Sequence, residues 1–397
     1  MKLYDVAGIA GKAFSNIVKT AKDHGFVRIV SATDIDPIIA ASILLRVFKE
    51  NDIDATAIFN PPVEIEEPTI FLDIMPQRCI KELCIVFRYT GGTEFSINSN
   101  VVNTPFSISA TILKTIEDIW ITSFHDRILC LVAGIDRGKD LSKNGFYGLE
   151  QSIAEELVSS NKLFYDIGFR LWGWKHQKIY KCLSRTLRPY LPGLSGLEEN
   201  TVNFLSKLGF SDPITVSSAD IMSSNDRVKA FATELIKIVR EKSLRKRDPY
   251  EIVSRVYYVG LRQDIVDLLR IYGAYFIALA LGGDILYNLL YAYLDTSFFT
   301  KLLLLYEYFS DKVSEEIVKG INNYTRERDF IVIKGNIVKR PEVYSKVFQD
   351  IGIKDYPLPI AIETGDHIIT SYLELVKAGK NIDLDKMNLD QTMYVGE

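Results

Sequence analysis

Short apolar segments alternate with helical patterns over the first 136 residues of this 397-residue chain, and this alternation limits the fold more than any other feature. The apolar segments are rich in β-branched and aromatic residues, and they span 26–34, 55–59, 69–74, 83–89 and 128–136. The helical patterns span 6–24, 37–51 and 107–121. Strands alternating with helices predict a mostly parallel sheet with helices on both faces.

The pattern changes near Leu149, where it becomes helical, with a break at 188–196 and one long helix predicted over 226–246. A later part begins with helices and ends with strand-like runs at 328–339 and 357–366. The fold class predicted is therefore α/β, with a connecting helix between a larger and a smaller domain. The boundaries expected are 1–225 for the first domain with its helical insertion at about 149–225, 226–249 for the connecting helix or linker, and 250–397 for the second domain.

Composition excludes several classes of protein. The formal net charge is -4, so the whole chain lacks the basic character of a nucleic-acid binder, and any such contact has to come from local patches. The four cysteines are scattered and form no CxxC pair, which disfavours a zinc site and predicts reduced thiols. The most apolar stretch, 272–294, contains two glycines, Asp284 and Asn288, and so predicts a buried helical hairpin and no membrane span. The N-terminal segment lacks the apolar core of a signal peptide, and we expect a cytoplasmic protein.

Four aspartates follow predicted strands: Asp34, Asp36, Asp73 and Asp136. Because ligands of an open α/β sheet bind beyond the carboxyl ends of its strands, these side chains are expected at one edge. A group of carboxylates there suits a two-metal phosphoesterase. Aspartates after strands are also common helix caps and turn formers, and the pattern alone does not decide between the two interpretations.

The motif around the first two aspartates resembles a known family. SATDIDPIIAASILLRVF (31–48) is similar to the first motif of DHH-family phosphoesterases, roughly HxDxDG, with Asp34 and Asp36 at its aspartates. Ala32 stands at the histidine position and Pro37 at the glycine position. IFLDI resembles the second motif through Asp73, and LVAGIDRG (131–138) resembles the fourth through Asp136. Where the DHH signature is expected, the chain has Phe87, Arg88 and Tyr89.

The resemblance continues through most of the chain. Segments 168–210 and 267–284 are similar to stretches of archaeal RecJ-like proteins, and 370–384 resembles the approach to their terminal GGGH motif. That motif is not found in YVGE, residues 394–397. The resemblance therefore implies a RecJ-like protein with degenerate nuclease motifs, in which the first domain is DHH-like and the second DHH-associated-like.

Losing the histidine and DHH positions implies losing metal ligands, so we expect no catalytic residues, no metal site, no cofactor and no nuclease activity at the ancestral site. Weak Mg²⁺ or Mn²⁺ binding by the four aspartates stays possible. Without metal, close carboxylates repel one another, and at least one is expected to have a raised pKa. Alternatively Arg88 or Arg137 neutralises them and makes the old site a structural ion-pair cluster.

The family includes a non-catalytic subunit of the replicative helicase. Archaeal RecJ-like proteins associate with GINS and, through it, with the MCM ring. The resemblance thus implies a scaffold subunit of that complex, with GINS and MCM as partners, single-stranded DNA as a further ligand, and no membrane. Two alternatives are a metal-dependent single-stranded DNA exonuclease with a divergent site and a simple single-stranded DNA-binding module.

Segment 172–188 interleaves aromatic and basic residues, as single-stranded DNA binding requires. The candidate DNA-binding residues are Trp174, Lys175, Lys178, Lys181, Arg185 and Arg188. An ordinary amphipathic helix with a solvated basic face explains the same pattern. A second basic cluster, 237–247, suits either a phosphate backbone or a solvated helix end. The apolar set at 298–308 fits core packing better than a partner surface.

Overall fold

The first sheet of the computed structural model is mostly parallel. The structure describes residues 3–62, 64–79, 82–92, 94–98, 100–261, 264–291, 297–353, 358–365, 367–383 and 386–396. The six strands have the order β2-β1-β3-β4-β6-β5, and only β5 runs antiparallel to its neighbour. They are β1 (Phe26–Ser31), β2 (Asp54–Ile58), β3 (Thr69–Leu72), β4 (Cys84–Tyr89), β5 (Ser96–Asn98) and β6 (Val101–Thr104). The predicted parallel sheet is confirmed, and the pair β5–β6 was not predicted.

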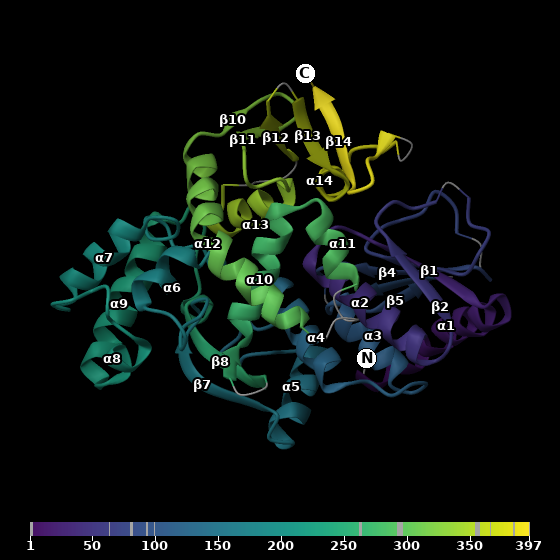
Figure 1. Ribbon diagram of the computed structural model, residues 1–397, viewed down its shortest axis with the longest axis horizontal. Coiled ribbons are helices and arrows are strands. Elements are labelled where there is room, and N and C mark those ends of the chain that lie inside the picture. Colours follow the sequence, from purple (N-terminus) through teal and green to yellow (C-terminus); the bar gives the residue numbers. More distant parts are fainter. Residues whose placement is uncertain are drawn as a thin grey trace.

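Helices cover one face of this sheet, where alternate strand residues such as Ile29, Leu72 and Phe87 are fully buried. These helices are α1 (Leu3–His24), α2 (Ile35–Glu50) and α3 (Ile108–Ile116). The opposite face packs on residues near the end of the chain, among them Tyr372 and Met393. The cover for the second face therefore comes from the distant end of the chain, and Figure 1 shows these segments side by side.

The apolar run at 128–136 is a helix, so its prediction as a strand was wrong. It forms the end of α4 (Phe124–Asp136), which begins at Ser123 with a capping box closed by Asp126. The run is apolar all round because α4 packs against α2, α3 and the later helix α10, and such burial removes the periodicity that separates helix from strand. Gly134 allows the next helix to approach, since an added Cβ would lie 2.7 Å from Glu150.

The middle of the chain is helical, as predicted, except for one strand. Its elements are α5 (Leu149–Ser159), β7 (Leu163–Phe169), α6 (Ile179–Arg185), α7 (Glu198–Lys207), α8 (Ser218–Met222), α9 (Asn225–Lys242) and the short 3₁₀ helix η1 (Pro249–Glu251). A separate hydrophobic core joins α6, α7, α8 and α9. The predicted linker after α9 packs on a later helix, since the Leu244 amide donates to the Ile351 carbonyl at 2.9 Å.

The later part begins with two strands, where helices were expected. The strands β8 (Val253–Leu261) and β9 (Asp264–Asp267) join β7 in a three-stranded antiparallel sheet of order β7-β8-β9. The predicted helical hairpin is confirmed as α10 (Leu268–Leu281) and α11 (Asp284–Tyr291). The long helix α12 (Phe298–Asn322) follows and packs along α10.

The last part of the chain forms a second mixed sheet, with order β10-β11-β12-β13-β14. Its strands are β10 (Thr325–Arg326), β11 (Ile331–Lys334), β12 (Ile360–Thr364), β13 (His367–Ser371) and β14 (Thr392–Gly396). Two helices lie between these strands in the chain, α13 (Pro341–Ile351) and α14 (Tyr372–Lys377). The division of the chain into domains at 225 and 249 stays a prediction. The sheet β7-β8-β9 contains strands from both sides of that division.

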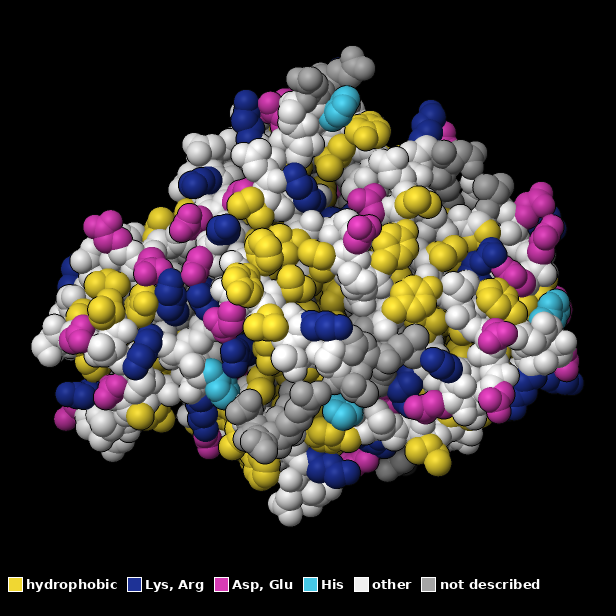
Figure 2. All heavy atoms as spheres, in the orientation of Figure 1, with side chains coloured by type: hydrophobic (Ala, Val, Ile, Leu, Met, Phe, Trp, Pro, Cys, Tyr) yellow, Lys and Arg dark blue, Asp and Glu magenta, His cyan; other side chains and the backbone are white. Residues whose placement is uncertain are grey.

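Two further features bear on the sequence expectations. None of the described helices is long and apolar enough to cross a membrane. Cys79 and Cys84 form a disulfide, so the expectation of reduced thiols was wrong for this pair, whereas Cys130 and Cys182 are free and buried. Hydrophobic side chains gather on the surface over α11 and α12, where a groove of about 530 Å³ is lined by Leu304 and Tyr308 among others (Figure 2).

Candidate functional site

A cleft of about 880 Å³ lies beyond the carboxyl ends of β3 and β4. Its other walls come from the end of α4 and from α13 and α14, so the two ends of the chain meet across it. The charged residues in the lining are Asp34, Asp73, Asp136 and Asp350, with Arg88, Arg137, Arg188, Arg245, Lys346 and Lys377. The cleft therefore contains three of the four predicted aspartates together with a larger number of basic side chains.

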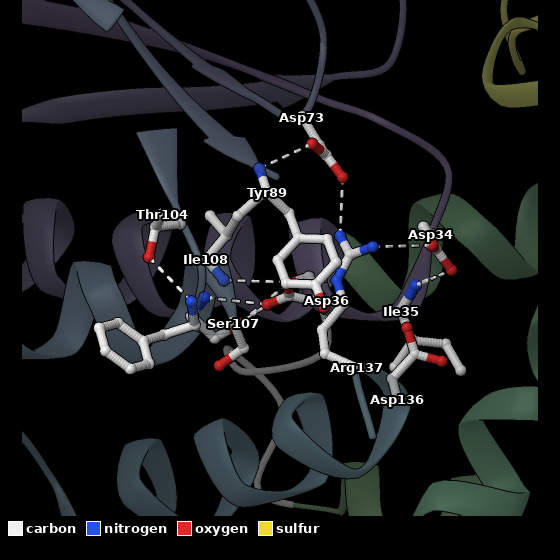
Figure 3. Close-up of polar contacts among 12 residues, drawn as sticks. Asp34, Ile35, Asp36, Asp73, Tyr89, Thr104, Ser107, Ile108, Asp136 and Arg137 are labelled. Carbon is white, nitrogen blue, oxygen red and sulfur yellow. Dashed lines mark hydrogen bonds and ion pairs between the residues drawn. The ribbon is translucent and has the colours of Figure 1, made fainter. Parts of the chain in front are cut away.

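One guanidinium group joins three of the four aspartates. Arg137 Nε lies 2.8 Å from an Asp36 carboxylate oxygen, and Arg137 Nη2 lies 2.7 Å from Asp73. Arg137 Nη1 lies 3.6 Å from Asp34. Figure 3 shows the guanidinium between the carboxylates, with the Tyr89 ring against it at 4.3 Å. The planar group and its five donors suit such a multiple contact.

The fourth aspartate is joined to the first by an ammonium group. Lys346 Nζ lies 2.5 Å from an Asp34 oxygen and also pairs with Asp136. Lys346 belongs to α13, more than 200 positions from either partner in the chain. Arg188 adds a weaker contact to Asp136 at 3.4 Å. Arg137 and Lys346 thus form two cationic centres that share Asp34.

Backbone amides also hold three of the aspartates in place. Asp36 accepts hydrogen bonds from the Ile108 and Ser109 amides, both at 2.9 Å, at the N-terminus of α3. Asp34 caps α2 through the Ile35 amide. Asp73 has a positive φ of 56° and accepts from the Tyr89 amide at 3.0 Å. Asp34 and Asp36 therefore accept hydrogen bonds at helix N-termini, as the second interpretation expects, and both also lie close to Asp73 around Arg137.

Asp136 reaches the site differently from its prediction. It is the last residue of α4, and Arg137 is the C-cap residue. It is thus not at a strand end, because the run that precedes it is helical. The turn at the end of α4 places Asp136 and Arg137 toward the cleft together.

The residues at the positions of the missing motif have different environments. Ala32 and Phe87 are fully buried in the hydrophobic cores on the two faces of the first sheet. Arg88 is exposed at the wall of the cleft. Tyr89 stacks on Arg137. Of the two arginines expected as neutralising groups, Arg137 has that role, and within the described residues Arg88 makes no ion pair with the aspartates.

Electrostatics in the cluster favour the ionised form of Asp34. Burial opposes ionisation of Asp34, but Lys346 and Arg137 outweigh it, and the pKa of Asp34 lies well below its ordinary value. Burial opposes the charge on Arg137 too, yet Asp73 and Asp36 hold the pKa of Arg137 well above its ordinary value. Asp34 is therefore not the carboxylate whose pKa was expected to be raised, because two cations lie beside it.

These residues do not fit a pair of divalent ions. Each of the four aspartates contacts Arg137 or Lys346, so a metal would have to displace a cation that already pairs with its ligands. The imidazoles of the family motif have no counterpart at Ala32 or Phe87, whose side chains carry no ligand atom. In the described ranges no group of three or more histidine, cysteine or acidic side chains is arranged to hold a metal ion.

The predicted DNA-binding residues do not form one surface. Trp174 is 2% exposed and packs on Phe169 and Phe231, so it offers no face to a base, which corrects its assignment. Arg185 is buried and pairs with Glu307 and Asp311. Lys181 pairs with Glu198 and Asp311, and Lys175 pairs with Asp166.

The remaining two candidates point in different directions. Lys178 is exposed and donates to the Thr215 carbonyl at 3.0 Å. Arg188 lies in the cleft, where it contacts Asp136 and the Tyr272 hydroxyl. Whether any of the five basic residues contacts DNA stays a prediction, but most of their charge is already neutralised within the chain.

The two other surface candidates each contain some exposed residues and some that are paired or buried within the chain. In the cluster at 237–247, Lys237, Arg240, Lys242 and Lys246 are exposed, whereas Arg245 and Arg247 pair with Glu251 and Asp350. In the set at 298–308, Leu302 and Tyr306 are buried, as core packing predicts, and Tyr308 is exposed. Sequence reasoning did not identify Lys346, and its local sequence, a lysine in an amphipathic helix, gives no signal for that role.

Comparisons with known proteins show which solved structures have a similar fold. No family model matches the sequence, and no curated protein matches it either. Among solved structures, CDC45 from Entamoeba histolytica is similar over 91% of this chain and 87% of its own, at 11% identity and a TM-score of 0.59. RecJ exonuclease bound to manganese matches over 93% of this chain and 84% of its own, at 11% identity and a TM-score of 0.43. RecJ with Mn²⁺ from Thermus thermophilus matches over 98% of this chain and 52% of its own, at 12% identity and a TM-score of 0.39.

The fold and the site define a mixed α/β protein with a large, mostly parallel sheet and an aspartate cluster held by cations. This is the fold class predicted from the DHH resemblance, and it is confirmed. More particularly, the chain has the fold of CDC45.

Proposed function

We propose that this chain is a non-catalytic, RecJ-like scaffold subunit of an archaeal replicative helicase complex, which binds GINS and through it MCM and so supports DNA unwinding. The observation that carries the proposal is the contact of Arg137 and Lys346 with all four aspartates of the cluster. A hydrolytic site needs those carboxylates for metal ions. Here they pair with cations of the chain, and Lys346 links α13 to Asp34 and Asp136.

The fold of CDC45 supports the replication part of the proposal. The interactions across the cleft support the scaffold part, because carboxylates that pair with cations of the chain itself are not available to metal ions. Besides Lys346, Gln391 is fully buried and donates to the Ser31 and Phe59 carbonyls at 2.8 and 2.6 Å. Arg340, also fully buried, contacts Thr33 and Glu342.

Binding to GINS tests the scaffold function. Purified chain and purified GINS are mixed at micromolar concentration and analysed by size-exclusion chromatography with light scattering, with and without MCM. We expect a complex with GINS alone and recruitment of MCM only when GINS is present. Absence of a GINS complex at these concentrations would contradict the proposal.

A metal-dependent single-stranded DNA exonuclease is the second candidate, favoured by the convergence of Asp34, Asp36 and Asp73 on one point. Its test is degradation of single-stranded DNA with Mn²⁺, compared with a variant carrying Asp34→Ala and Asp36→Ala. Degradation that disappears in the variant would establish the exonuclease and refute the non-catalytic role. Degradation that is equal in both would come from a contaminant.

A further inference from the structure

Strand β7 forms an open edge of the small sheet. It pairs with β8 over its full length, from Leu163 with Val259 to Phe169 with Val253. On its other side, the described part of the chain supplies neither a second strand nor a backbone hydrogen bond to 164–168. Figure 1 shows β7 along the lower margin of the molecule. Unpaired amide and carbonyl groups on such an edge are a template for another strand.

The side chains of this edge are unusually apolar for exposed positions. Phe164 is 52% exposed, Tyr165 40% and Ile167 60%. Between them lies only one charged residue, Asp166, which pairs with Lys175. Edge strands are normally protected by charge, proline or a covering segment. An edge with three exposed apolar side chains therefore indicates a surface that another polypeptide covers.

A cavity beside the edge indicates that a binding partner carries a negative charge there. Tyr165 and Ile167 lie on one face of β7, opposite Tyr257 and Arg255 of β8. That face borders a cavity of about 420 Å³, lined by Arg255, Tyr165 and Tyr257 and by residues of α5, among them Glu155, which accepts a hydrogen bond from Gln151. The Arg255 guanidinium lies 4.4 Å from the Tyr165 ring centre, and no carboxylate pairs with it among the residues described. A carboxylate from outside would complete its contacts.

A second copy of this chain fits the edge poorly. Antiparallel pairing of two β7 strands in full overlap places Asp166 opposite Asp166 of the other copy, and like charges directly opposite one another are destabilising. It also brings no carboxylate to Arg255 from the strand itself, since β7 has no acidic residue on that face. A strand with alternating apolar residues and an acidic residue on the Arg255 side satisfies both the edge and the cavity.

We propose that the β7 edge binds an extended segment of a different protein, which adds as a fourth strand and places a glutamate or aspartate in the cavity of Arg255. The seven residues of β7 allow an overlap of about 23 Å. Main-chain hydrogen bonds supply the attachment, and the apolar and acidic side chains supply the specificity. This surface is separate from the charged cleft and does not depend on the function proposed for it.

Three fluorescein-labelled peptides test the inference by fluorescence anisotropy with the full chain. The first is Val-Thr-Val-Thr-Glu-Thr-Val-Thr, the second has lysine in place of glutamate, and the third has proline in place of two inner threonines. We expect saturable binding of the glutamate peptide and binding weaker by about tenfold or more for the other two. Arg255→Gln should bring the glutamate and lysine peptides to equal affinity.

Surface variants assign the binding to the edge. Ile167→Lys should weaken the glutamate peptide by about tenfold, whereas Ile214→Lys, at a position that is 54% exposed on another part of the chain, should not. If circular dichroism shows that Ile167→Lys is misfolded, Ile167→Thr serves in its place, because it keeps the β-branched shape. No binding of the glutamate peptide at about 1 mM, or equal binding of the proline peptide, would overturn the proposal. So would a concentration-dependent dimer that Ile167→Lys abolishes, because the edge would then belong to a second copy.

Discussion

Replacing Arg137 by alanine tests whether the cations hold the aspartate cluster together. The side chain of Arg137 is 10% exposed, and its three carboxylate partners are between 0% and 13% exposed. Breaking a buried ion pair by removing one partner costs about 3–5 kcal/mol, because the other charge stays buried without compensation. The variant should therefore lose a large part of a typical stability of about 5–15 kcal/mol.

The remaining contacts of each carboxylate refine this magnitude. Asp36 keeps two amide donors and the Ser109 hydroxyl, and Asp34 keeps Lys346. Within the described residues Asp73 keeps only the Tyr89 amide as a hydrogen-bond donor, so it bears most of the loss. Water entering from the cleft reduces the cost, and we expect about 3 kcal/mol at pH 7.

Urea denaturation monitored by circular dichroism measures the loss. Arg127→Ala is the matched control, because Arg127 also pairs with two carboxylates, Glu117 and Glu156, which are 20% and 50% exposed, and more solvated pairs of this kind contribute about 1 kcal/mol or less. Adding Asp73→Asn to Arg137→Ala should recover part of the stability, and 1 mM Mn²⁺ should raise the midpoint of the Arg137→Ala variant but not of the wild type. A loss below about 1 kcal/mol for Arg137→Ala, equal to the control, would refute the reasoning.

Three further predictions concern the core around the cleft. Lys346→Met should cost about 2–4 kcal/mol at pH 7 in urea denaturation, and an unchanged midpoint would contradict the role of Lys346 in holding the cleft closed. Burial raises the pKa of Glu150 to about 7, above its unfolded value, so stability should fall by about 3 kcal/mol as pH rises from 4.5 to beyond 7; Glu150→Gln should abolish this slope in thermal scans across that range. Gln391→Leu should cost about 2–4 kcal/mol, because it orphans buried carbonyls, and Leu389→Ala, at an exposed neighbour, should change little.

The sequence predicted the first sheet well because its strands carry strong local signals. Thr69–Leu72 and Cys84–Tyr89 are β-branched or aromatic runs with clear boundaries. It failed at 128–136, where burial on all sides removed the helical period and left only the capping box of Ser123 as a signal. The strand Leu163–Phe169 was also missed. Its exposed positions include the apolar residues Phe164, Tyr165 and Ile167, so its sequence does not alternate between apolar and polar residues.

The residues of the site also fall into those that the sequence could predict and those that it could not. Asp34, Asp36 and Asp73 could be found because each is close in sequence to a strand whose carboxyl end faces the cleft. Lys346 could not, because its place beside Asp34 depends on how α13 docks across the cleft, and no local pattern encodes that contact. Trp174 was misassigned for a related reason: an aromatic residue between lysines suits a base or a core equally well, and only the tertiary packing on Phe231 decides.

The charge arrangement explains how four aspartates can lie close together without a metal ion. Four carboxylates at one point repel one another, and this repulsion is a pressure against keeping all of them ionised there. Arg137 removes that pressure, because it follows Asp136 directly and the end of α4 directs both toward the cleft. Lys346 adds a second cation from the far end of the chain, which makes closure of the cleft part of the stability of the cluster. On this reasoning a variant lacking both cations should be the one most dependent on added Mn²⁺ for folding, and equal Mn²⁺ dependence in the wild type would show that the cations do not replace the metal.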